Sequence, residues 1–268
     1  MTSSSAAGFE NATEQRAPID LQIHGVIPPW LSGVLYRTGP GTYHIQSTNV
    51  VEIQHWFDGL AMHHRFDIFP GGERVSYCSH HGADDLERQI AEKGRYPTFS
   101  FGQREDPCQT IFRKFFTAFQ AMRTQDASSA SPSGINASVT LTPNMPGLDA
   151  KTSDPRYIVA KTDASILQII DPKTLEPLVA TTYKQLDSRL DGPLSAAHSC
   201  RDQETGDFYN YSCKFGGRFP TYKIFRIGGK DGKVDVLAEI KDAPLSYIHS
   251  FAMTERYVVL CVWQAHFK

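Results

Sequence analysis

The strongest constraint on the fold is a succession of short, β-prone runs separated by turn residues. Between residues 137 and 263 the turns include Asp171-Pro172, Gly216-Gly217 and Gly228-Gly229. The runs do not alternate with helical patterns, which excludes a βαβ fold and favours an all-β meander built from radial repeats. The expected strands are 137–141, 157–162, 165–170, 178–183, 208–214, 221–226, 234–240 and 257–263.

The N-terminal third repeats this pattern. Short strands are expected at 34–37, 61–68 and 75–79, with Asp58-Gly59 and Gly71-Gly72 as turn residues. Three such strands in a meander are typical of one blade of a β-propeller.

Composition along the chain suggests where the folded domain lies. Residues 1–17 are small and polar, so we expect a disordered N-terminal extension, with the propeller domain covering residues 18–268. Residues 84–94 are charged and are expected to form an exposed helix or loop. Residues 125–134 are rich in Ser, Ala and Pro, which indicates a low-complexity linker inside the domain.

Two histidines occur in similar settings. His198 and His249 each precede a polar turn that leads into an apolar, β-prone run, and their separation is close to one propeller blade of about 40–50 residues. Repeats place side chains at equivalent points around an axis, and neutral imidazoles that converge there suit a borderline metal such as iron. The alternative is that each histidine is a structural residue at the start of a strand.

Residues 108–124 carry a different pattern, an aromatic stripe. With helical spacing its apolar side chains fall on one face, beside the basic residues Arg113 and Lys114. The stripe consists of Ile111, Phe112, Phe115, Phe116 and Phe119. One interpretation is a helix packed on the body of the protein. The other is a membrane patch that dips into a bilayer, with the basic residues at the headgroups.

The composition excludes several classes of protein. A formal net charge of −2 gives no general attraction to nucleic acid. The 5 cysteines are odd in number and lack CxxC spacing, which indicates reduced thiols in the cytoplasm rather than a disulfide framework or a zinc site. The sequence shows no signal peptide and no apolar run of the roughly 18 residues that a spanning helix needs. We therefore expect a cytoplasmic protein that is soluble or peripheral on membranes.

A set of motifs occurs in a fixed order from about Leu21 to the last residue. The motifs are Gly33-Val-Leu-Tyr-Arg-Thr-Gly-Pro-Gly41, His55-Trp-Phe-Asp-Gly59, Asp106-Pro-Cys-Gln-Thr-Ile-Phe-Arg-Lys-Phe-Phe116, Asp171-Pro-Lys-Thr-Leu-Glu176, Ala197-His198 with Thr205-Gly206 and Tyr209-Asn210, and His249-Ser-Phe-Ala-Met-Thr-Glu255. Each motif alone is weak. Together they resemble the carotenoid cleavage oxygenases, and most closely the fungal branch that cleaves carotenoids or torulene.

The resemblance implies a seven-bladed β-propeller with a helical cap insertion. In that family four histidines hold non-haem ferrous iron (Fe2+) on the propeller axis, and the enzyme uses O2 to split a conjugated C=C bond of a carotenoid or apocarotenoid into two carbonyl products. By the same resemblance His198 and His249 occupy the first two ligand positions. Asp163 aligns with a carboxylate that holds the far nitrogen of a ligand imidazole. The alternative for Asp163 is an aspartate that caps its own turn.

The resemblance covers only the N-terminal half of the family's chain. The third and fourth ligands would lie beyond Lys268, and seven blades of about 40 residues need about 280 residues before any cap is counted. We therefore expect a truncated propeller with weak or no activity. A competing hypothesis is a non-catalytic fragment that binds membrane or apocarotenoid without turnover, and the iron content of the chain distinguishes the two.

One further position concerns the substrate. Stilbene-cleaving relatives carry a phenol-binding lysine directly before the carboxylate, where this chain has Thr162. Lys161 lies one place earlier and, in a strand, on the opposite face. This pattern favours a polyene substrate. The alternative of a stilbene-cleaving oxygenase stays open, because a shift of one residue in the alignment would restore the lysine.

Overall fold

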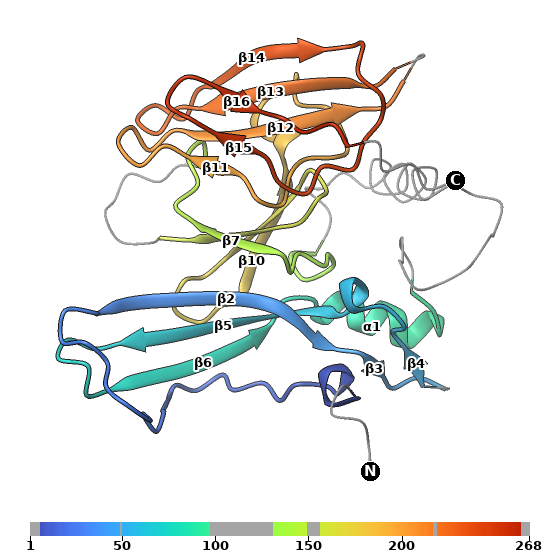
Figure 1. Ribbon diagram of the computed structural model, residues 1–268. Helices are drawn as coiled ribbons and strands as arrows, with labels where there is room; N and C mark the ends of the chain where they lie inside the picture. The colour runs from blue at the N-terminus through green and yellow to red at the C-terminus, as the bar shows by residue number, and fades with distance from the viewer. Residues whose placement is uncertain (1–5, 49, 97–130, 149–155, 217–218, 264–268) are drawn as a thin grey trace.

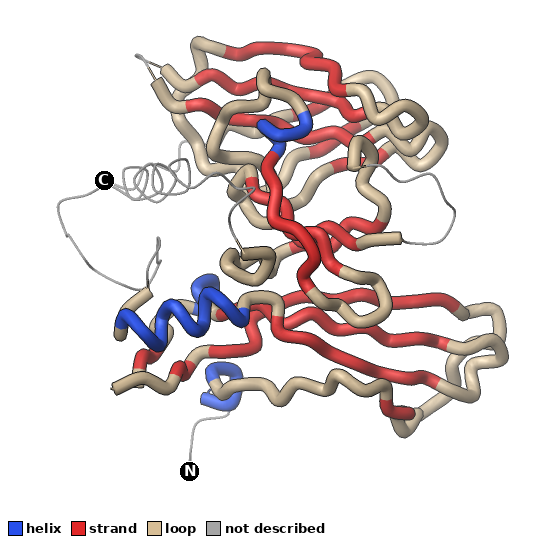
Figure 2. The backbone as a smooth tube through the Cα atoms, turned by 180° about the vertical axis from the view of Figure 1, so that it is seen from behind, coloured by secondary structure: helices blue, strands red, loops and turns tan. Residues whose placement is uncertain are grey.

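The computed structural model describes residues 6–48, 50–96, 131–148, 156–216 and 219–263. Within these ranges the chain consists mainly of antiparallel β-strands with a few short helices, so the all-β fold class is confirmed. No helix in the described ranges has the length and apolar character needed to cross a membrane. The four-stranded sheets follow one another in space in the order in which they occur in the chain (Figure 1, and Figure 2 from behind).

The first sheet has the strand order β1-β6-β5-β2. Its strands are β1 (Ile19–Asp20), β2 (Gly33–Thr42), β5 (Leu60–Ile68) and β6 (Val75–His81). The hairpin between β5 and β6 turns through Gly71 and Gly72, whose φ angles of 90° and 74° lie in the left-handed region that glycine adopts without steric cost. A two-stranded ladder of β3 (His44–Ile45) and β4 (Val51–Glu52) follows β2.

The second sheet has the order β10-β9-β8-β7, and the third has the order β11-β12-β13-β14. The strands of the second sheet are β7 (Thr140–Pro143), β8 (Ile158–Lys161), β9 (Ile166–Ile170) and β10 (Pro177–Thr182). The strands of the third sheet are β11 (Cys200–Arg201), β12 (Phe208–Lys214), β13 (Thr221–Ile227) and β14 (Val234–Ile240). A last ladder joins β15 (Ala252–Met253) and β16 (Val258–Val259).

The second and third sheets are antiparallel meanders, which is the form of a propeller blade, whereas in the first sheet β1 pairs with the last strand, β6. Among the described strands no sheet closes on itself, and the number of blades stays a prediction.

Apolar side chains fill the space between neighbouring sheets. Between the second and third sheets, Phe208 and Phe225 are 0% exposed and pack on the ring of Tyr183. A smaller cluster between the first and second sheets consists of Cys78, Ile158, Ile170 and Leu175. Close packing of this kind leaves little freedom for the sheets to slide, so it fixes the loops that carry the functional side chains.

The charged segment after β6 forms a helix, α1 (Asp84–Lys93). Acidic residues in its first turn and Lys93 in its last turn complement the helix dipole, and Gly94 ends it with a φ of 64°. Leu86 and Ile90 are buried, so one face of the helix packs on the protein. The remaining helical pieces are short: η1 (Ala6–Phe9), η2 (Trp56–Asp58) and α3 (Tyr183–Leu186).

The described part of the expected N-terminal extension is hydrogen-bonded to the first sheet and the segment after it. The Asn11 side chain accepts a hydrogen bond from the backbone N–H of Tyr43 at 2.8 Å. The Ser79 backbone N–H donates to the Gln15 carbonyl oxygen at 2.7 Å, and the Gln15 N–H donates to the Ser79 hydroxyl at 2.9 Å. The polar residues that suggested disorder therefore supply hydrogen-bond partners for strand backbone.

The aromatic stripe of residues 108–124, including the membrane patch, lies outside the described residues. The same holds for most of the expected linker at 125–134. The described end of that linker lies against α1, because the Ser133 hydroxyl donates to Asp85 at 2.8 Å and the Ser133 carbonyl accepts from the Leu86 N–H at 3.1 Å.

Candidate metal centre

His198 and His249 lie side by side, although they belong to different segments of the chain. Their imidazole ring centroids are 4.7 Å apart, with the ring planes at 70° to each other. The His198 backbone N–H donates to the His249 carbonyl oxygen at 3.2 Å. His198 stands just before β11 and His249 just before β15. The structure thus brings the two residues predicted as ligands together from adjacent sheets.

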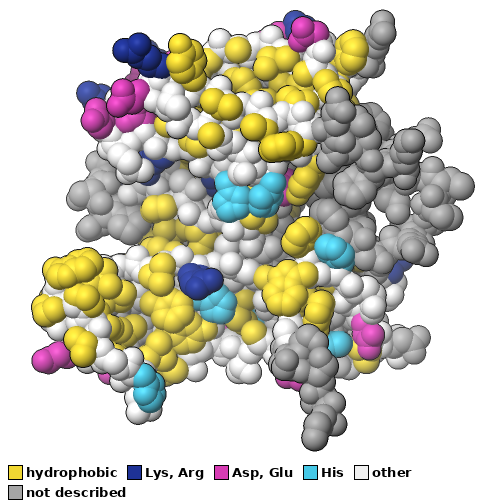
Figure 3. Space-filling view, viewed as in Figure 1, with side chains coloured by type: hydrophobic (Ala, Val, Ile, Leu, Met, Phe, Trp, Pro, Cys, Tyr) yellow, Lys and Arg dark blue, Asp and Glu magenta, His cyan; other side chains and the backbone are white. Residues whose placement is uncertain are grey.

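The histidine pair is accessible from one face of the molecule. The side chain of His249 is 45% exposed, and His198 is exposed as well. In Figure 3, histidine side chains gather midway between the first sheet, below, and the third sheet, above. Because both side chains are exposed, a ligand can approach the pair.

Asp163, in the turn after β8, connects the two histidine segments. Both carboxylate oxygens lie within hydrogen-bond distance of His249 Nδ1, at 2.9 and 3.0 Å. Oδ1 also accepts from the Ala197 backbone N–H at 3.2 Å, and Oδ2 accepts from the Tyr247 hydroxyl. These partners lie far along the chain from Asp163, which argues against the alternative of an aspartate that caps its own turn.

The contact with Asp163 fixes the tautomer of His249. A carboxylate oxygen only accepts hydrogen bonds, so the imidazole proton is on Nδ1 and the lone pair of Nε2 is free for a metal. The hydrogen bond to Asp163 raises the pKa of His249, against the lowering effect of burial. Partial burial lowers the pKa of His198, and the neighbouring His249 lowers it further. His198 is therefore neutral at neutral pH and has a lone pair to offer.

The imidazoles of His198 and His249 are suitable ligands for a metal of borderline character, but they are only two. Neutral imidazoles suit iron, copper, nickel and zinc, and a ligand imidazole held by a carboxylate is the usual arrangement around such metals. In the part of the chain that the structure describes, no group of three or more His, Cys, Asp and Glu side chains is placed to hold a metal ion. The described residues therefore offer two neighbouring imidazoles to a metal and no third side chain of these types that is placed to hold it with them.

Lys161, at the end of β8, lies in the interior beside the pair. It is 1% exposed, and its ammonium group donates to the Ser199 hydroxyl and lies 5.0 Å from the centre of the Phe208 ring. Burial lowers the pKa of Lys161 to about 7. The amine is thus turned into the protein, toward the residue that follows His198.

Tyr247 and Ala197 contact Asp163, but the sequence pattern does not single them out. Tyr247 stands two residues before His249, a spacing that places side chains on one side of an extended segment. Its ring lies nearly parallel to the His249 imidazole, with the centroids 6.4 Å and the planes 23° apart. That spacing is the signal from which its role could have been inferred. Ala197 acts through its backbone N–H, which no side-chain motif encodes.

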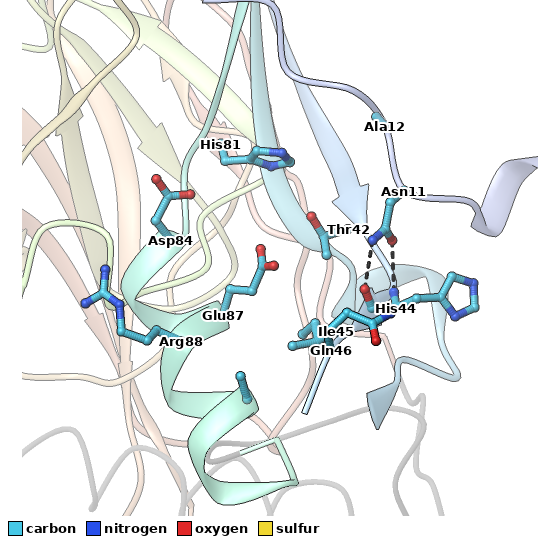
Figure 4. Close-up of a pocket in the computed structure, with 11 residues that line it drawn as sticks. Asn11, Ala12, Thr42, His44, Ile45, Gln46, His81, Asp84, Glu87 and Arg88 are labelled. Carbon is cyan, nitrogen blue, oxygen red and sulfur yellow. Dashed lines mark hydrogen bonds between the residues drawn. The ribbon is translucent and has the colours of Figure 1, made fainter. Parts of the chain in front are cut away.

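A separate cavity lies between the N-terminal segment, the β2–β3 region and α1 (Figure 4). Its lining is mainly polar and includes Asn11, His81, Asp84 and Glu87. Neither His198 nor His249 lines it, so it is distinct from the candidate metal centre.

Comparison with known proteins shows the family of the chain. Residues 8–268 match the family model of RPE65, the retinal pigment epithelial membrane protein. The chain is 38% identical, over 97% of its length, to a carotenoid dioxygenase of Neurospora crassa and to a torulene dioxygenase of Fusarium fujikuroi. A solved structure of a Synechocystis apocarotenoid oxygenase variant superposes with a TM-score of 0.64 at 19% identity, covering 95% of this chain and 48% of that one. The chain spans about half the length of the curated relatives, 47% of each fungal protein. The chain belongs to the carotenoid oxygenase family.

Proposed function

We propose that this chain supplies two iron ligands of a non-haem dioxygenase that cleaves a conjugated C=C bond of a carotenoid or apocarotenoid. The observation that carries the proposal is the contact between the imidazoles of His198 and His249, with Asp163 bonded to one of them. The carotenoid and torulene dioxygenases among the relatives support the substrate class. Because the chain spans about half of those proteins, their activity is inferred for it.

In this proposal His198 and His249 hold Fe2+ through ring nitrogens, and Asp163 keeps the proton on Nδ1 of His249. Bound iron would supply the activation of O2 and the oxidation of the double bond. The backbone hydrogen bond between the two histidines and the Asp163 carboxylate set the spacing of the pair before a metal binds.

The position of Lys161 supports a polyene rather than a stilbene as substrate. A lysine that binds a phenol has to present its amine to the substrate, whereas the Lys161 amine is buried and bonded to Ser199. The residue directly before Asp163 is Thr162, which carries no charge.

We also propose that the protein is cytoplasmic and works as a peripheral membrane protein, because carotenoids partition into lipid. The support is the aromatic stripe of residues 108–124 beside Arg113 and Lys114. The 268-residue chain alone is expected to hold iron weakly and to turn over little substrate, since the described residues offer two imidazoles to a metal that the family binds with four.

Metal titration tests the ligand assignment. Under anaerobic conditions, the wild-type chain and the variants His198→Ala and His249→Ala are titrated with Fe2+, with His24→Ala, at an exposed histidine, as the matched control. Wild type and His24→Ala should bind one iron per chain, and both ligand variants should lose that binding. Equal binding by all four proteins would overturn the assignment.

An aerobic assay tests the reaction itself. Each protein is incubated with Fe2+, ascorbate and β-carotene or an apocarotenal, and aldehyde products are separated by chromatography. Turnover that disappears in His198→Ala would show that the 268 residues suffice for cleavage, against the weak activity expected here.

A further inference from the structure

The Asp163 carboxylate, in a residue that is 8% exposed, is held from more than one side. The Ala197 N–H bonds to Oδ1 and the Tyr247 hydroxyl to Oδ2, while His249 Nδ1 faces both oxygens. The torsion that turns a carboxylate about its last bond has a broad energy profile, so it is set by the donors around it. The orientation that His249 meets therefore depends on Ala197 and Tyr247 together.

The Tyr247 hydroxyl is not what anchors the backbone of its own segment. The Ser246 N–H donates to the Tyr222 hydroxyl at 2.7 Å. On the other side, the Tyr211 hydroxyl donates to the Ile248 carbonyl oxygen at 2.9 Å. These bonds hold the residues before and after Tyr247, so its hydroxyl can be removed while the segment stays in place.

The ring of Tyr247 has a separate role in packing, because it stacks on the His249 imidazole and lies against the core cluster beneath. Phenylalanine would keep this contact and lose the bond to Asp163. We propose that Tyr247 is a positioning residue: its hydroxyl locks the Asp163 carboxylate in the orientation that keeps the His249 proton on Nδ1 and leaves Nε2 for the metal. The effect on metal affinity rests on the proposed function, whereas the effect on the imidazole is a property of the metal-free protein.

Loss of the hydroxyl would leave Oδ2 of Asp163 with only the His249 N–H, which Oδ2 shares with Oδ1, as a donor in a largely buried site, and this is unfavourable. The carboxylate would then turn, and His249 would populate its other tautomer or rotate away. Removing an outer partner of a ligand imidazole typically weakens metal binding 10- to 100-fold. Because Asp163 itself remains in Tyr247→Phe, we expect the lower end, about tenfold.

The first test measures Co2+ affinity by competition with a chromophoric chelator. Tyr247→Phe should bind about tenfold more weakly than wild type. The matched control is Tyr157→Phe, which removes a hydroxyl that donates to the Met145 carbonyl at 2.7 Å, and it should bind as wild type does. Asp163→Asn and the double variant Asp163→Asn/Tyr247→Phe should bind equally, because Tyr247 acts through Asp163. Additive losses in the double variant would overturn the proposal.

The second test needs no metal. The chain is labelled with 15N-histidine, and the His249 signals are assigned by their loss in His249→Gln. At pH 8 wild type should show the form protonated on Nδ1, and Tyr247→Phe should show a mixture with the form protonated on Nε2, with the other histidine signals unchanged. Identical His249 signals in both proteins would refute the positioning role. If wild type binds no Co2+ but the tautomer still shifts, the proposed function fails and the positioning role stands.

Discussion

Asp163 and His249 are separated by 86 residues in the chain, yet His249 Nδ1 lies 2.9 Å from Asp163 Oδ1. The variant Asp163→Asn replaces this carboxylate by an amide. It removes the negative charge that accepts the hydrogen bond from the His249 Nδ1–H. We expect metal affinity to fall 10- to 100-fold, measured by chelator competition. Asp231→Asn, at an exposed turn carboxylate, is the control and should keep wild-type affinity. Equal affinities in the two variants would contradict the role of Asp163.

The packing between the second and third sheets predicts a large stability effect at Phe208. This side chain is 0% exposed, so Phe208→Ala should leave a cavity and lower the free energy of unfolding by about 3–5 kcal/mol, measured by urea denaturation. Phe57→Ala, at a residue that is 65% exposed, should cost less than about 1 kcal/mol. Similar losses in both variants would show that the sheets are not packed as described.

Burial of Lys161 predicts a pH dependence of stability. Its pKa is lowered to about 7 in the folded protein, whereas a lysine in the unfolded chain titrates near about 10.4. Between these values the unfolded state binds one more proton, so this group makes the free energy of unfolding rise with pH by about 1.4 kcal/mol per unit. Lys161→Met lacks the effect.

Denaturation of wild type and Lys161→Met should therefore be compared from about pH 7.5 to about pH 9. The stability difference should move in favour of wild type as the pH rises. The control is Lys233→Met, at a side chain that is 79% exposed. The same pH trend in both variants would contradict the prediction.

The aromatic stripe predicts membrane binding through Phe112 and Phe116. The double variant Phe112→Glu/Phe116→Glu should co-sediment less with liposomes than wild type, because charged groups do not enter the apolar region. Gln22→Glu/Gln54→Glu adds the same charge at exposed positions and serves as the control. Equal binding by all three proteins would reject the membrane patch.

Much of the fold follows from local pattern. The expected strand at 208–214 matches β12 residue for residue, and most of its side chains are buried in the clusters on the two sides of the sheet. The expected strand at 257–263 pairs only over Val258–Val259. Strand pairing depends on a partner, and in the described residues that partner is the short β15. β-propensity alone does not determine how far a ladder extends.

The site was predictable to the extent that it repeats a motif. His198, His249 and Asp163 were predicted from motifs, and the structure brings the three residues together. The Tyr247 hydroxyl reaches Asp163 across 84 residues of sequence, and the Ala197 bond uses a backbone N–H. Contacts of this kind arise from the stacking of sheets, and the spacing of two residues between Tyr247 and His249 is the one local sequence signal that points to them.

The N-terminal segment affects how readily the edge of the first sheet can pair with another chain. A strand at the margin of a sheet presents free N–H and C=O groups, which recruit any extended peptide nearby and so promote aggregation. Along β6 this margin is occupied: β1 pairs with Tyr77, Gln15 bonds to Ser79, and the Glu14 carboxylate accepts the His81 N–H at 2.7 Å. The N-terminal segment thus covers backbone groups of β6 that could otherwise pair with a strand of another chain.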